Sequence, residues 1–107
     1  MTKEAKINGE QIYQLVLGEV RQQAKEYKTP EQLELSLEHY SAFMEYLDKN
    51  PEKRGEVKEL SYVVINGVTL YIIPSQQVLE PIKDEQGEEV LDEQSNPKMK
   101  ELIFRVS

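Results

Sequence analysis

The chain has 107 residues, a formal net charge of -7 and no cysteine, with 38% hydrophobic and 31% charged residues. This size predicts a single domain over residues 1–107 with a hydrophobic core of its own. The lack of cysteine excludes disulfides and cysteine-based metal sites, and the negative charge argues against direct nucleic-acid binding, which needs a basic surface.

No stretch contains the roughly 20 apolar residues that a membrane span requires, and the first residues lack the apolar segment of a secretory leader. We therefore expect a soluble protein that does not contact membranes. A cysteine-free chain fits the reducing cytoplasm, which is the location we expect.

The first predicted element is an amphipathic helix over residues 8–28. Asn8 is suited to cap its start, and Gln11 completes a capping box. Apolar side chains follow at helical spacing: Ile12, Leu15, Val16, Val20, Ala24 and Tyr27. Gly18 falls on the opposite, polar side, where glycine costs up to ~1 kcal/mol relative to alanine.

A second helix is predicted over residues 30–49. Thr29 and Pro30, with Gln32 completing a second capping box, are typical of a helix start. The helix is expected to end at Asn50, because a proline follows and disfavours the helical conformation there. Few residues separate the two predicted helices, so we expect an antiparallel helical hairpin.

Residues 57–73 predict a β-hairpin. Two runs of β-branched and aromatic residues flank Asn66 and Gly67, a pair typical of a two-residue type I′ turn. This turn predicts the register Ile65 with Val68, Val63 with Leu70, Tyr62 with Tyr71, and Leu60 with Ile73. The preceding Lys53-Arg54-Gly55 is interpreted only as the connection from helix to sheet.

Beyond the hairpin the pattern is weaker. Residues 77–83 are compatible with an edge strand, residues 84–98 with a loop, and residues 100–106 with a half-buried strand. The prediction is an α+β fold in which an N-terminal antiparallel helical hairpin packs on a three- or four-stranded antiparallel sheet. No internal repeat is evident.

The sequence shows no motif for catalysis or cofactor binding. Its five glycines are scattered, so the glycine-rich turns that bind nucleotide phosphates are absent. His39 is the only histidine and is expected to form an ordinary hydrogen bond rather than to act as a metal ligand or base. We therefore predict no catalytic residue, no metal and no cofactor.

An acidic segment occupies residues 84–93. Its six carboxylates are Asp84, Glu85, Glu88, Glu89, Asp92 and Glu93. The segment lacks the ligand spacing of a calcium-binding EF-hand loop. Because like charges repel and extend the chain, we interpret it first as a solvated loop and second as a candidate contact for a basic partner.

The second predicted helix would align five more carboxylates within about 100° of its circumference. This predicted acidic ridge consists of Glu31, Glu34, Glu38, Glu45 and Asp48. Such a row either meets a basic partner or only keeps the protein soluble. As a further alternative, Arg21, Lys25 and Lys28 of the first helix lie close enough to compensate its charge.

Both faces of the predicted hairpin are apolar, although a two-layer fold needs only one such face. Two helices can cover one of them. The second face carries Leu60, Tyr62, Val64, Tyr71 and Ile73. We expect either the C-terminal segment or another molecule to cover it, since large exposed apolar patches are typical of interfaces.

These patterns favour a non-enzymatic protein-protein interaction module. It would be a small acidic regulator or inhibitor that docks on a basic surface of a larger partner, such as a nucleic-acid-binding protein. The alternative is a self-assembling structural or accessory subunit, with the second sheet face as a homodimer contact. A carboxylate-based enzyme is the third hypothesis, because such mechanisms leave no sequence motif.

Overall fold

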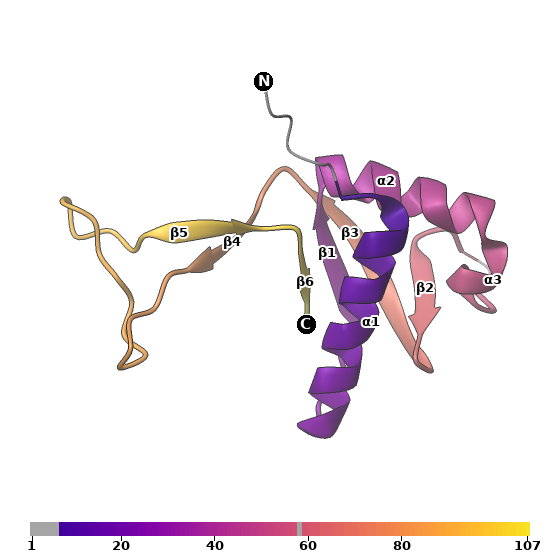
Figure 1. Cartoon of the computed structure of the whole chain (residues 1–107), viewed down its shortest axis with the longest axis horizontal. Helices are drawn as coiled ribbons and strands as arrows, with labels where there is room; N and C mark the ends of the chain where they lie inside the picture. Colours follow the sequence, from indigo (N-terminus) through magenta and orange to yellow (C-terminus); the bar gives the residue numbers. More distant parts are fainter. Residues whose placement is uncertain (1–6, 58) are drawn as a thin grey trace.

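The computed structural model describes residues 7–57 and 59–107. These residues form an α+β fold with a four-stranded mixed sheet, helices against one face of that sheet, and a second, two-stranded sheet (Figure 1). The predicted domain over residues 1–107 also includes residues 1–6 and 58, which lie outside the described part.

The first helix, α1, spans Gly9–Lys25 and begins as predicted. The Asn8 side chain accepts a hydrogen bond from the Gln11 N–H at 2.8 Å, and the Gln11 side chain accepts one from the Asn8 N–H at 2.9 Å. This reciprocal arrangement satisfies two N–H groups that have no partner within the helix. The buried side of α1 includes Ile12, Val16 and Val20, as the helical spacing predicts.

The second predicted helix is wrong over its first third. Gln32–Ser36 form strand β1, Leu37–Lys49 form helix α2, and Pro51–Arg54 form the short helix α3. Leu33 and Leu35 are fully buried in the sheet, so tertiary packing outweighs the helix-start signal. Because β1 lies between α1 and α2 in the chain, the predicted helical hairpin is not confirmed, although the two helices pack against each other.

Strands β2 (Tyr62–Ile65) and β3 (Val68–Ser75) form the predicted hairpin. Asn66 and Gly67 have φ angles of 54° and 77°, which a type I′ turn requires. Three predicted pairs are confirmed: Tyr62 with Tyr71, Val63 with Leu70, and Ile65 with Val68. Leu60 lies before β2, so its predicted pairing with Ile73 is not part of the register.

The main sheet has the strand order β2-β3-β1-β6. Since β1 lies parallel to β3 and antiparallel to β6, the sheet is mixed and not purely antiparallel as predicted. The predicted strand over residues 100–106 is divided into β5 (Met99–Leu102) and β6 (Phe104–Val106). Only β6 joins the main sheet, whereas β5 pairs with β4 (Val78–Pro81) in the second sheet.

The core lies between the helices and one face of the main sheet. Its fully buried side chains include Ile12, Val16, Val20, Leu33, Leu35, Phe43, Val63, Ile65 and Leu70. Gly9 lies where α1 crosses α2: a Cβ atom there would be 2.4 Å from both the Ala42 carbonyl oxygen and the Tyr46 Cβ. Glycine therefore permits the close approach of the two helices.

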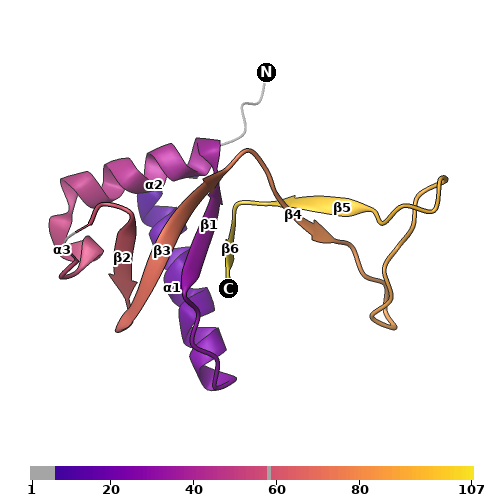
Figure 2. The same ribbon diagram turned by 180° about the vertical axis from the view of Figure 1, so that it is seen from behind.

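Residues 78–102, here called the arm, project away from the helices and the main sheet (Figures 1 and 2). Two loops lie between β4 and β5 in the chain, one over residues 84–88 and one over residues 92–96. In each loop the first Asp side chain accepts hydrogen bonds from the N–H groups two and four residues later, at 2.8 to 3.0 Å. The loops thus repeat one structure, and the predicted absence of any repeat is wrong at this scale.

Candidate interaction surface

The sheet face opposite the helices, here called the open face, is not covered by any helix of the described residues (Figure 2). Side chains alternate between the two faces of a strand, so every second residue contributes to it. The open face carries Gln32 and Glu34 of β1, Tyr62 and Val64 of β2, Thr69, Tyr71 and Ile73 of β3, and Arg105 of β6. It therefore includes four of the five residues predicted for the second apolar face.

Tyr62 and Tyr71 form an aromatic pair at the centre of the predicted patch. Their ring centroids are 5.2 Å apart and the ring planes are tilted by 59°, which suits an edge-to-face contact. Tyr71 is 42% exposed and Leu60, before β2, is 71% exposed. Val64 and Ile73 are half-buried. Strand β6 adds to the edge of the sheet and does not cover the tyrosines, contrary to one of the two predicted options.

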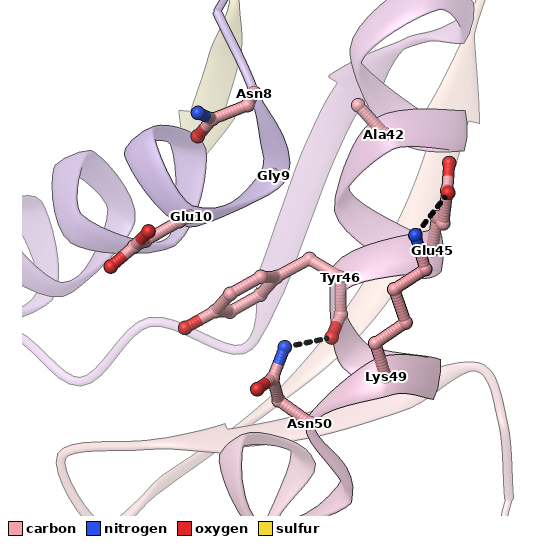
Figure 3. A pocket seen from close by; sticks show the side chains of 8 residues that line it. All are labelled: Asn8, Gly9, Glu10, Ala42, Glu45, Tyr46, Lys49 and Asn50. Atoms are coloured by element: carbon pink, nitrogen blue, oxygen red, sulfur yellow. Dashed lines mark hydrogen bonds and ion pairs between the residues drawn. The ribbon is translucent and has the colours of Figure 1, made fainter.

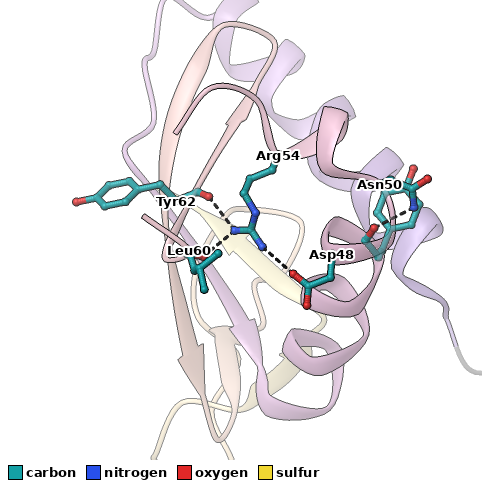
Figure 4. Close-up of polar contacts among 6 residues, drawn as sticks. Asp48, Asn50, Arg54, Leu60 and Tyr62 are labelled. Carbon is teal, nitrogen blue, oxygen red and sulfur yellow. Dashed lines mark hydrogen bonds and ion pairs between the residues drawn. The ribbon is translucent and has the colours of Figure 1, made fainter. Parts of the chain in front are cut away.

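Arg54 lies at the outer edge of β2, beside the backbone of Tyr62 (Figure 4). Its guanidinium donates to the carbonyl oxygens of Leu60 at 2.7 Å and Tyr62 at 3.3 Å, and lies 3.4 Å from the Asp48 carboxylate. Edge strands with unpaired backbone groups tend to pair with other chains. Arg54 is only 8% exposed, and its guanidinium shields the part of this edge at Leu60 and Tyr62.

Glu34 was predicted on a helical ridge but lies on the open face. Its carboxylate accepts a hydrogen bond from the Ser75 hydroxyl at 2.7 Å and pairs with the Arg105 guanidinium at 2.9 Å. The hydrogen bond from Ser75, followed by that from Arg105, lowers the pKa of Glu34 below its ordinary value. Arg105 also donates to the Leu79 carbonyl oxygen at 2.8 Å, which ties the arm to the sheet.

The predicted acidic ridge is not a single row. Glu31 precedes β1 and Glu34 lies within it, whereas the other three residues are exposed on α2. Of these three, Glu45 pairs with Lys49 at 2.8 Å, and Asp48 pairs with the Arg54 guanidinium. The row was an artefact of extending helical periodicity through a strand, so its charges are divided between two surfaces and partly neutralised.

The arm holds all the carboxylates of the predicted acidic loop. Asp84 and Asp92 are occupied by backbone N–H groups of their own loops. The remaining four are exposed and form no ion pair within residues 7–57 and 59–107: Glu85, Glu88, Glu89 and Glu93. The arm therefore presents unneutralised negative charge away from the main sheet.

A ring of backbone hydrogen bonds joins the arm where its two loops meet. The Ile82 N–H donates to the Lys98 carbonyl oxygen, the Lys98 N–H to that of Val90, and the Val90 N–H to that of Ile82, at 2.8 to 2.9 Å. Each of the three segments thus donates to the next and accepts from the previous one. This junction and the two Asp-centred loops give the segment a definite conformation, and its side chains are mostly exposed, as expected for the predicted loop.

Comparisons with family models, curated proteins and solved structures find no match to this chain. Its role is therefore inferred from its own surfaces. Sequence reasoning located the tyrosine pair and the acidic segment but assigned no role to Arg54 or Arg105. The position of Arg54 between the last helix and the hairpin was the available signal for it, whereas the pairing of Arg105 with Glu34 depends on a strand order that the sequence does not reveal.

A shallow hollow of about 500 Å³ lies between the start of α1 and the end of α2 (Figure 3). The Tyr46 ring lies beside it, and most of its polar groups pair with one another. Glu45 and Lys49 form the ion pair described above, and the Asn50 amide donates to the Tyr46 carbonyl oxygen at 2.9 Å. These contacts mainly stabilise the end of α2.

His39 also has an ordinary environment, because its Nδ1 shares a hydrogen bond with the Ser36 hydroxyl, as predicted. Among residues 7–57 and 59–107, no group of three or more His, Asp or Glu side chains is arranged to hold a metal ion. In the same part of the chain, every helix is too short or too polar to cross a membrane.

Proposed function

We propose that the protein is a non-enzymatic protein-binding module that uses the open face as an apolar anchor and the acidic arm as an electrostatic contact. The observation that supports this most directly is Tyr71, 42% exposed beside Tyr62 on a sheet face without a covering helix in the described residues. Tyrosine is enriched at binding hot spots because it combines a large contact area with a hydroxyl that tolerates water.

The charge of the arm indicates the kind of partner. Residues 78–102 carry eight carboxylates and three lysines. A basic surface complements this charge, and such complementarity accelerates association and favours the correct partner. Proteins that bind nucleic acids have basic surfaces of this kind, so a small regulator or inhibitor of such a protein fits the charge distribution.

The construction of the arm also favours a partner. A two-stranded hairpin is at best marginally stable in water, because it buries little apolar surface. The arm leaves Leu91 52% exposed and Met99 45% exposed. Contact with a partner would bury these side chains and stabilise the arm, which supports a role for it in binding.

Affinity capture from the native cell extract tests this proposal. The bait is the full chain, alongside Tyr71→Asp and the control Tyr27→Asp, whose tyrosine is 98% exposed and lies after α1. We expect the unmodified chain and the control to retain the same basic protein at low salt, and Tyr71→Asp to lose it. Equal recovery with all three baits would contradict the use of the open face.

Self-assembly is the second candidate function, because an exposed apolar sheet face also suits a symmetric homodimer. Size-exclusion chromatography with light scattering distinguishes the two. A mass that stays monomeric at all concentrations rejects self-assembly. A dimer that Tyr71→Asp dissociates would favour self-assembly over binding of a separate partner.

A further inference from the structure

The edge of the main sheet formed by β6 is closed less completely than the edge formed by β2. Gln32 and Ser107 exchange two backbone hydrogen bonds, with N···O distances of 2.8 and 3.0 Å. Such pairs alternate with non-hydrogen-bonded pairs along an antiparallel ladder. Phe104 and Val106, opposite Leu35 and Leu33, therefore direct their backbone N–H and C=O groups away from β1, toward the outer edge.

One of these four groups has a partner in the described part of the chain. The Val106 carbonyl oxygen accepts a hydrogen bond from the Gln23 side chain of α1 at 2.9 Å. No other residue in 7–57 or 59–107 forms a hydrogen bond with the Phe104 N–H, the Phe104 C=O or the Val106 N–H. On the β2 edge, both outward groups of Tyr62 have partners: its carbonyl oxygen accepts from Arg54 and its N–H donates to the Glu59 carbonyl oxygen, at 3.3 Å each.

A groove of about 590 Å³ runs along β6 and is lined by residues of α1, β4, β5 and β6. Its apolar lining includes Leu102, Phe104 and Val106, its carboxylates are Glu19, Glu80 and Glu101, and its Arg105 is paired with Glu34. Glu80 lies 3.4 Å from Lys100, whereas Glu19 and Glu101 form no ion pair with the described residues. The groove thus combines apolar surface, negative charge and a row of strand hydrogen-bonding groups.

We propose that this edge binds an extended segment of a partner protein as an added β-strand, and that the segment alternates apolar residues with lysine or arginine. Backbone groups that lack partners accept a strand because its N–H and C=O groups repeat at the same spacing. The carboxylates Glu19 and Glu101 favour basic side chains beside that strand. A second copy of this chain is disfavoured, because each copy has a net charge of -7.

This inference deepens the proposed protein-binding function but uses a surface other than the open face. The probe is an acetylated, amidated eight-residue peptide that alternates lysine with valine, titrated into the ¹⁵N-labelled full chain. We expect the amide signals of Phe104 and Val106 to shift and their hydrogen exchange to slow. We expect two control peptides not to bind. One has glutamate in place of lysine. The other is N-methylated at every second residue, so that its edge facing β6 lacks N–H groups.

Matched variants separate this site from the open face. Reversing the two exposed charges with Glu19→Lys and Glu101→Lys should weaken binding of the lysine peptide by about tenfold. Tyr71→Asp should leave the affinity for the lysine peptide unchanged. An experiment that rejects binding at the open face is thus distinguishable from one that rejects binding at the β6 edge. The inference is overturned by equal binding of the N-methylated peptide, or by a saturating titration without shifts at Phe104 and Val106. Shifts that depend on protein concentration alone would assign the edge to a second copy and also overturn it.

Discussion

The Arg105 guanidinium lies 2.9 Å from the Glu34 carboxylate and 2.8 Å from the Leu79 carbonyl oxygen. One side chain on β6 thereby connects β1 of the main sheet with β4 of the arm. Ser75 on β3 donates to the second oxygen of the same carboxylate at 2.7 Å. A small polar network on the open face thus links the arm to the main sheet.

This network predicts that stability depends on the charge of Glu34. Its pKa is lowered in the folded state, first by the hydrogen bond from Ser75 and then by that from Arg105. The stabilisation is therefore fully present above the unfolded pKa of about 4.3 and is lost as the pH falls through the lower, folded pKa. The free energy of unfolding of the unmodified protein should therefore fall between neutral pH and about pH 3. We expect a smaller fall for Glu34→Gln, measured by urea denaturation.

Glu38→Gln is the control for this experiment, because Glu38 is exposed on α2 and forms no ion pair within the described residues. It should leave the pH dependence almost unchanged. Identical pH profiles for Glu34→Gln and the unmodified protein would show that the network contributes no stability.

Two glycines of α1 predict opposite effects of the same substitution. Gly9→Ala places a methyl group 2.4 Å from the Ala42 carbonyl oxygen and the Tyr46 Cβ, so α1 and α2 must separate. We expect a loss of about 1–3 kcal/mol in the free energy of unfolding. Gly18→Ala meets no atom of the described residues within 4 Å, apart from the backbone of its own helix, and should raise the free energy of unfolding by up to ~1 kcal/mol. Chemical denaturation of both variants checks this, and a neutral Gly9→Ala would reject the close helix crossing.

Arg54 is predicted to stabilise the β2 edge through its hydrogen bonds. Arg54→Ala leaves the Leu60 and Tyr62 carbonyl oxygens without this donor and should cost about 1–3 kcal/mol in unfolding free energy. Arg54→Lys should recover only part of that loss, since an ammonium group lacks the planar fork of a guanidinium. Arg21→Ala, at an exposed position of α1, serves as the control for loss of a positive charge. A full rescue by lysine would contradict a specific role for the guanidinium group.

The first arm loop depends on the Asp84 side chain as an acceptor of two backbone hydrogen bonds. Asp84→Ala removes the acceptor, and we expect the amide protons of Gln86 and Glu88 to exchange several-fold faster, by analogy with the ~1 kcal/mol effect of helix capping side chains. Asp84→Asn keeps a side-chain oxygen and should preserve most of the protection. Asp92→Ala should affect the second loop alone. NMR-detected hydrogen exchange measures all three, and unchanged exchange in Asp84→Ala would reject the assigned loop structure.

The correctly predicted elements are those with local signals. The capping box at Asn8 and Gln11 is formed within four residues, and the turn at Asn66 and Gly67 sets its own register. The strand β1 is different, because its partner β3 lies about forty residues further along the chain. The Thr29-Pro30 signal resembles a helix start, and only pairing with a distant strand reveals that residues 32–36 are extended.

The residues of the candidate surface were likewise predictable only where the signal was local. The Tyr62–Tyr71 pair followed from the turn register, so sequence alone located the centre of the open face. The acidic ridge rested on helical periodicity through Glu31 and Glu34, and it disappeared with that part of the helix. The Asp-Glu-Gln triplets at residues 84–86 and 92–94 were visible in the sequence, but their meaning as two equivalent loops emerges only from the hydrogen bonds of the arm.

Hydroxyl-radical footprinting of the chain, free and bound to the partner recovered by affinity capture, tests the use of the open face most directly. Tyr71 and Tyr27 are both exposed in the free protein, at 42% and 98%, so each provides a readable label. We predict that the partner strongly reduces labelling of Tyr71 and leaves Tyr27 unchanged. Undiminished labelling of Tyr71 in the complex would contradict the open face as the binding surface.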